Sequence, residues 1–191
     1  LLGASAFLHV LADFLKFKTS SPCGDLLSLL AGIRQMWIEK GKKAIVYQRL
    51  NMVGAGYVGA IHPFKNELGE EVCMNRYMFD MVRPLLLAQE YIEDFIVFEG
   101  QQVDIDLDKI RMEVYTNQPK GSLNRWVFHV YPEMATNLAE SWLKIPEVKY
   151  NEEKKVIINL TFRYRNPSVH YFFLRKYENL LIFSGLQVER D

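Results

Sequence analysis

The residues from Thr19 to Leu30, T-S-S-P-C-G-D-L-L-S-L-L, join two stretches that together restrict the fold. Residues 14–18 before this segment favour a β-strand, and residues 25–39 have the apolar spacing of an amphipathic helix. Gly41 stands where such a helix would end, and residues 44–50 favour a second strand. A strand, a helix and a strand in this order predict a parallel βαβ unit with a right-handed crossover, and therefore an α/β fold.

One carboxylate lies at the start of the predicted helix. We expect the helix to begin at Asp25, directly after a small, polar turn formed by Ser20, Ser21, Pro22, Cys23 and Gly24. Open α/β sheets bind ligands at the carboxyl ends of their strands, and the partial positive charge of a helix N-terminus stabilises a carboxylate. Asp25 is therefore either a residue that satisfies free backbone N–H groups of the first helical turn or a functional carboxylate at the mouth of a ligand crevice.

The composition narrows the classes of function. The 191 residues include 23 basic and 23 acidic side chains, which argues against nucleic acid as the main partner because duplex-binding domains usually carry a strong basic excess. The hydrophobic fraction of 49% is enough for a folded core. The two cysteines, Cys23 and Cys73, have no metal-ligand spacing, so we expect reduced thiols in a cytoplasmic protein and no metal site.

The beginning of the chain is mostly apolar. A transmembrane helix needs about 20 apolar residues, and His9 and Asp13 interrupt this run. A signal peptide would need a basic leader, and none precedes the run. We therefore interpret residues 1–13 as an N-terminal extension, with a short helix as its expected structure, and we expect the first domain to span residues 14–150.

The middle of the chain is less regular. Residues 74–92 favour a helix, and Pro84 within them predicts two helices or a kink. Residues 96–98 and 126–131 favour strands, and residues 133–142 favour a helix. Together with the first βαβ unit, these segments predict a Rossmann-like parallel sheet with flanking helices.

Three aspartates alternate with apolar residues between Gln101 and Ile110. Single apolar residues separate Asp104, Asp106 and Asp108, a pattern typical of a half-buried strand or of a turn into a helix. An EF-hand calcium loop would also need a Gly at its sixth position and a Glu at its twelfth, and this segment has neither. We therefore predict a solvated acidic face here and not a calcium site.

Residues 54–59, G-A-G-Y-V-G, match the glycine pattern of dinucleotide-binding loops and follow a predicted strand. In those loops the glycines open a helix whose N-terminus holds the pyrophosphate. Here Pro63 and Gly69 leave no room for a helix of ordinary length, and Asp80, which has the spacing of the acidic ribose ligand, lies in a helical stretch. We interpret residues 51–70 as a Gly-rich loop, so an NAD-dependent oxidoreductase is a less favoured function.

A strand pattern begins again near the end of the chain. The charged residues 147–155 precede two stretches that favour strands, 156–161 and 180–184, with a short helix expected at 170–177. We predict that residues 151–191 contain the first βαβ unit of a second Rossmann-like domain. One such unit is too small for a whole domain, so we expect the second half to be truncated or degenerate.

Three motifs resemble the heptosyltransferase-like glycosyltransferases of the GT-B fold. That family begins with a strand, a turn of the form T-S-S-L-G-D and a helix, and here Pro22 and Cys23 replace the single Leu. The matching residues are Thr19, Ser20, Ser21, Gly24 and Asp25, followed by Leu26, Leu27, Leu30 and Ala31. Residues 158–166, I-N-L-T-F-R-Y-R-N, resemble the strand and basic loop that open the family's nucleotide-sugar domain, and residues 183–186 with Glu189 resemble the next strand and turn.

The resemblance implies an inverting, metal-independent transfer of a sugar from a nucleotide-sugar donor to a glycan or lipid-linked acceptor. It implies Asp25 as the catalytic base and the turn residues Ser20, Ser21 and Gly24 at the mouth of the active site. It also implies a donor phosphate site formed by Thr161, Arg163 and Arg165, whose hydroxyl and guanidinium groups suit phosphate oxygens.

The resemblance implies no cofactor, since the nucleotide sugar is a substrate, and a lipid-linked acceptor leaves peripheral association with a membrane open. The family's later donor motif, which contains Gly, Asp and His, does not occur in these 191 residues. A non-catalytic binding or structural module derived from the GT-B fold is therefore the alternative to an enzyme.

Overall fold

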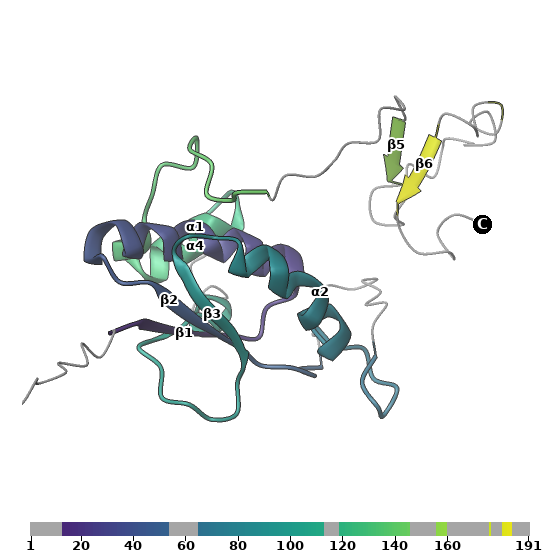
Figure 1. The fold of residues 1–191 in the computed structure, drawn as a ribbon, viewed down its shortest axis with the longest axis horizontal. Helices are drawn as coiled ribbons and strands as arrows, with labels where there is room; N and C mark the ends of the chain where they lie inside the picture. Colours follow the sequence, from purple (N-terminus) through teal and green to yellow (C-terminus); the bar gives the residue numbers. More distant parts are fainter. Residues whose placement is uncertain are drawn as a thin grey trace, which may run out of the picture. The chain divides into compact units, whose positions relative to one another are not determined.

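The chain folds into two compact units in a computed structural model (Figure 1). The structure describes residues 13–53, 65–112, 119–145, 156–159, 176 and 181–184. The first unit comprises Leu1–Gly54 and Phe64–Pro146, and the second comprises Ala55–Pro63 and Glu147–Asp191.

The first unit is an α/β structure built on a parallel sheet. Its four strands lie in the order β3-β2-β1-β4, and each neighbouring pair is parallel. The predicted βαβ unit is confirmed, since β1 and β2 pair in parallel and α1 connects them. The elements are β1 (Leu15–Thr19), α1 (Cys23–Lys40), β2 (Ala44–Gln48), α2 (Arg76–Leu87), β3 (Ile92–Val97), β4 (Ile105–Asp106), α4 (Leu123–Val130) and the 3-10 helix η1 (Pro132–Met134).

Helix α1 begins at Cys23, two residues before the predicted start, so Asp25 lies within its first turn. The helix ends as predicted, because Gly41 adopts a left-handed conformation with φ of 66° and donates its N–H to the carbonyl of Trp37. A glycine suits this position because a side chain would strain the left-handed backbone.

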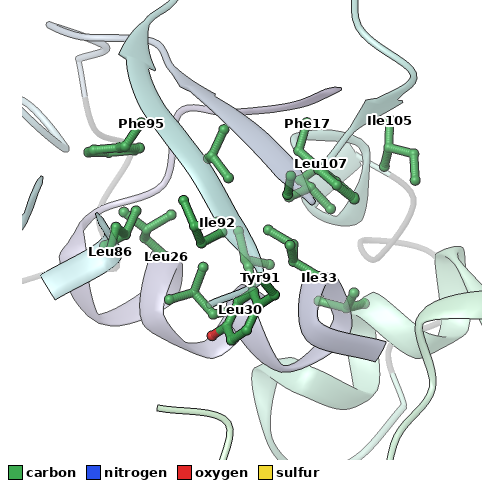
Figure 2. Close-up of a cluster of buried hydrophobic side chains, with 14 of the residues drawn as sticks. Phe17, Leu26, Leu30, Ile33, Leu86, Tyr91, Ile92, Phe95, Ile105 and Leu107 are labelled. Carbon is green, nitrogen blue, oxygen red and sulfur yellow. The ribbon is translucent and has the colours of Figure 1, made fainter. Parts of the chain in front are cut away.

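The core of the first unit lies where α1 packs on the sheet (Figure 2). Leu26, Leu30 and Ile33 on α1 are fully buried because helical spacing places them on one face. Phe17 of β1 and Phe95 of β3 approach them from the sheet. The burial of this face fixes α1, and with it the turn that precedes α1.

The prediction of a strand at residues 126–131 is wrong, because these residues lie mainly in helix α4. Its aromatic and β-branched residues favour strands, but such propensities are weak and packing overrides them. Val127 is buried, and Asn124, one helical turn before it, donates its side-chain N–H to the carbonyl of Ser28 on α1 at 2.8 Å. Figure 1 shows α4 beside α1, so the segment gains more from covering α1 than from extending the sheet.

The prediction of a helix at residues 133–142 is also wrong, because only the short 3-10 helix η1 forms there. The residues after η1 are held by individual hydrogen bonds that involve side chains, and not by the repeating backbone hydrogen bonds of a helix. The indole N–H of Trp142 donates to the carbonyl of Leu27 at 2.9 Å, and the Trp142 carbonyl accepts a hydrogen bond from the Tyr91 hydroxyl at 2.6 Å. Gln89 exchanges two hydrogen bonds with the backbone of Lys144. Burial also raises the pKa of Tyr91 well above its usual value.

Helix α2 is one helix and not two, although Pro84 lies inside it. The proline lies in the second half of the helix, where it removes a single backbone hydrogen bond, and buried Phe79, Val82 and Leu86 hold the helix against the sheet. Strand β3 begins at Ile92 and is longer than the strand predicted at residues 96–98.

The second unit contains a pair of parallel strands, β5 (Val156–Asn159) and β6 (Leu181–Ser184). Both lie within the stretches predicted as strands, so the renewed strand pattern is confirmed at this level. Most of the helix predicted at residues 170–177 lies outside the described residues.

Close packing of α1 against η1 predicts a large penalty for Gly32→Ala. A Cβ at position 32 would lie 2.9 Å from Met134 Cβ and 3.3 Å from its carbonyl oxygen, and these atoms cannot move aside as the end of a side chain can. We expect a loss of about 1–3 kcal/mol in the free energy of unfolding. All three tryptophans belong to the first unit, so urea titration followed by tryptophan fluorescence measures this unit.

Gly24→Ala is the matched control in the same helix. A Cβ at position 24 would meet nothing within 4 Å, and alanine is a better helix former than glycine by up to about 1 kcal/mol. We expect Gly24→Ala to leave the unit as stable as before or more stable. Equal losses in both variants would show that the contact with Met134 is not the cause.

Candidate functional site

The order of the strands defines a switch point at the carboxyl end of the sheet. Strand β2 lies on one side of β1 and β4 lies on the other, so the segments that leave the parallel strands β1 and β4 begin side by side at this edge. Ligands of open α/β sheets bind at such a point, outside the carboxyl ends of the strands. The residues at issue are therefore those after β1, from Ser20 to Asp25, and those after β4, from Leu107 to Arg111.

Asp25 forms an ion pair with Arg111 across the switch point. The Arg111 Nη2 donates to Oδ2 of Asp25, and their side chains are 46% and 32% exposed. Among the described residues, no hydrogen bond involves the other carboxylate oxygen, Oδ1. The N-cap of α1 is Pro22, with no side-chain cap bond, so the carboxylate of Asp25 faces a guanidinium instead of capping backbone N–H groups.

A second contact joins the same two segments. The Asp108 Oδ1 accepts hydrogen bonds from the backbone N–H of Ser20 at 2.6 Å and from its hydroxyl at 2.8 Å. Arg111 donates its backbone N–H to the carbonyl of Asp108 at 3.1 Å, so one turn of chain carries both Asp108 and Arg111. Ser20 thus lies at the predicted site, but its polar groups bind Asp108.

The alternation of apolar and acidic residues is confirmed as a half-buried strand that leads into a turn, since Ile105 and Leu107 are buried while the aspartates between and beside them are exposed or half-buried. These aspartates also pair with β1 and with the residue that follows it, which the sequence did not predict. Asp104 accepts the Lys16 N–H, Asp106 accepts from the Lys18 ammonium, and Asp108 accepts from Ser20; each pair is 88 residues apart in sequence. The constant separation reflects the parallel register of β4 on β1. The three carboxylates are therefore partners of this strand, and within the described residues no group of acidic, His or Cys side chains is arranged to hold a metal ion.

Lys18 is the cation at the centre of this row. Its ammonium lies 2.8 Å from Asp106 Oδ2 and 3.3 Å from Asp108 Oδ2, with 15% of the side chain exposed. Burial lowers the pKa of Lys18, but the hydrogen bond to Asp106 and the charges of both aspartates outweigh that effect and raise it above its usual value. Lys18 therefore remains charged and holds the start of the β4 loop against β1.

Ser21 is buried, and its backbone hydrogen bonds hold the turn after β1 in place. Its N–H donates to the Thr19 hydroxyl at 3.1 Å, and its carbonyl accepts from the Gln48 side chain at 3.2 Å. Gln48 is fully buried at the carboxyl end of β2, and its Oε1 has no hydrogen-bond partner among the residues that the structure describes. Of the three residues predicted at the mouth of the site, Ser20 and Ser21 hold the loop in shape through their hydrogen bonds, and a Cβ added at Gly24 would meet nothing within 4 Å.

The two cysteines lie near the same edge as half-buried free thiols. Burial raises the pKa of Cys23, the first residue of α1. Burial and the charge of Asp108 raise the pKa of Cys73. Both thiols are thus less reactive than a free cysteine, because the thiolate is the nucleophilic form.

The predicted donor residues Thr161, Arg163 and Arg165 lie outside the described residues, as does the glycine pattern at 54–59. Their roles stay predictions. Arg111 and Asp108 are the residues that sequence reasoning missed. Their place in the sequence could have indicated them, because both follow a short stretch that favours a strand. In the structure this strand, β4, ends beside the end of β1.

Comparison of the chain with protein-family models, with curated proteins and with solved structures finds no match. Within the ranges that the structure describes, no helix is long and apolar enough to cross a membrane. The function is therefore inferred from the residues at the switch point and from the sequence resemblance.

Proposed function

We propose that the protein is a glycosyltransferase of the GT-B type, with Asp25 as the general base. The observation that carries this proposal is the position of the Asp25 carboxylate. It lies in the first turn of α1 beside the switch point of a parallel sheet, where Arg111 binds one of its oxygens and the other has no described partner. A carboxylate with a free oxygen at a ligand edge can accept a proton from a bound hydroxyl.

The proposed step transfers a sugar from a nucleotide-sugar donor to a glycan or lipid-linked acceptor. An acceptor hydroxyl attacks the anomeric carbon, and its proton passes to Asp25. A new C–O bond forms as the bond between the anomeric carbon and the diphosphate oxygen breaks, so the nucleoside diphosphate leaves with the electron pair. The attack comes from the face opposite the leaving group, which inverts the anomeric centre.

The residues proposed to bind the donor belong to the second unit. Thr161, Arg163 and Arg165 supply a hydroxyl and two guanidinium groups, which bind phosphate oxygens well. These charges would stabilise the departing diphosphate without a metal ion. The free thiols Cys23 and Cys73 agree with a cytoplasmic location, where nucleotide sugars are substrates of such reactions.

The proposal is tested by incubating the full-length protein with ADP-, GDP- and UDP-linked hexoses and measuring release of the nucleoside diphosphate, with water as acceptor. We expect release from at least one donor, and we expect the same rate after metal removal with EDTA. Absence of release from every donor, together with absence of nucleotide binding by calorimetry, would favour the non-catalytic module instead.

A further inference from the structure

The ion pair of Arg111 with Asp25 gives Arg111 a role that the sequence motif does not contain. We infer that Arg111 is a positioning residue, which holds the Asp25 carboxylate in one orientation with Oδ1 directed to the acceptor hydroxyl. This inference rests on the proposed function, because it concerns the orientation of the proposed base. The inference follows from the pairing of Arg111 with Oδ2 of Asp25 and from the hydrogen bonds that join the segments after β1 and β4.

Both partners of the pair are attached to fully buried neighbours. Leu26 follows Asp25 and Ile110 precedes Arg111, and each is 0% exposed. The bonds from Asp108 to Ser20 fix the two segments to each other beside the pair. The backbones that carry Asp25 and Arg111 therefore stay in place when either side chain is changed.

The pair itself contributes little to folding. Its side chains are 46% and 32% exposed, and solvent screens ion pairs of this kind so that they stabilise the fold only weakly. A guanidinium has five N–H donors and no acceptor, so Arg111 cannot take the proton from the acceptor. What it supplies is a fixed donor for Oδ2, which restricts rotation of the carboxylate and leaves Oδ1 for the proton transfer.

The chain contains a closely matched control pair. Arg83 donates to Asp94 at 2.9 Å, with side chains 42% and 37% exposed, on α2 and β3. Arg83→Ala removes an ion pair of nearly the same exposure without touching the residues after β1 or β4. Any general effect of losing such a pair appears in both variants.

The test measures kcat and KM for nucleoside diphosphate release from the most active of the ADP-, GDP- and UDP-linked hexoses. We expect Arg111→Ala to lower kcat by roughly 10- to 100-fold, because a misplaced catalytic group loses about that much rate. We expect KM to stay within about twofold, since a positioning residue acts in the reaction step and not in donor binding. Arg83→Ala should change neither, and both variants should unfold at similar urea concentrations.

Two further measurements separate orientation from other effects. Arg111→Lys should recover part of kcat, because an ammonium can pair with Oδ2 but lacks the planar fork of arginine. Methylguanidinium added to Arg111→Ala should also raise kcat, and it should have no effect on Arg83→Ala.

The possible results distinguish this inference from the proposed function. If Asp25→Asn abolishes turnover but Arg111→Ala keeps the full kcat, the role of Arg111 is overturned and the proposed base stands. A raised KM with unchanged kcat in Arg111→Ala also overturns it, since Arg111 would then bind substrate. If Asp25→Asn keeps full turnover, the proposed base is wrong, and the role of Arg111 is overturned with it.

Discussion

Asp25→Asn is expected to lower the rate of nucleoside diphosphate release by roughly 100- to 10,000-fold, which is the usual contribution of a positioned general base. The amide has nearly the shape of the carboxylate but cannot accept the proton of the attacking hydroxyl or water. Asp25→Ala should lose as much, because it removes the base and the partner of Arg111 together. The rate is measured with the donor that the wild-type protein uses.

The stability of these variants must be checked, because Asp25 also lies in the first turn of α1. Loss of a carboxylate there costs about 0.3–1 kcal/mol through the helix dipole, which leaves the unit folded. Asp94→Asn is the matched control, since Asp94 is 37% exposed and pairs with Arg83. We expect this control to keep full activity. Turnover of Asp25→Asn at the wild-type rate would refute the assignment of the base.

Leu107→Ala is expected to reduce the free energy of unfolding of the first unit by about 2–5 kcal/mol, the range found for buried leucines. Leu107 is fully buried directly after β4, and Figure 2 shows it beside Phe17 and Ile105. Its removal leaves a cavity under the turn that carries Asp108 and Arg111. Since folded domains are stable by only about 5–15 kcal/mol, this is a large share of the total.

The measurement is the urea midpoint by tryptophan fluorescence, with Leu68→Ala as the control. Leu68 is 83% exposed in the loop before α2, so its truncation should change stability by no more than about 0.5 kcal/mol. A Leu107→Ala protein as stable as the control would show that the alternation of apolar and acidic residues does not direct Leu107 into the core.

The parts of the fold that could be predicted depend on local patterns. The strand, helix and strand from Leu15 to Gln48 follow from apolar spacing and from one glycine, and Asp25 follows from its place after the first strand. The errors lie where distant contacts decide. In α4, packing on α1 overrides strand propensity, and near Trp142 single hydrogen bonds to Leu27 and Tyr91 replace a helix.

The partners within the candidate site could not be predicted for the same reason. Arg111 is 86 residues from Asp25, and Asp108 is 88 residues from Ser20. These pairs exist because β4 lies beside β1 in parallel, and the sequence contains no local sign of which strand lies next to which. An alternation of apolar and acidic residues indicates which side chains are buried and which are not, but it does not identify the strand with which the segment pairs.

The shortness of β4 also bears on how the sheet ends. An edge strand exposes unpaired backbone groups on which a strand of another molecule can add, and proteins limit this with short or charged edges. Here β4 has two residues, and Asp104 and Asp106 turn their carboxylates to Lys16 and Lys18 of β1. The short strand that carries these aspartates therefore also leaves little backbone at this edge for intermolecular strand pairing.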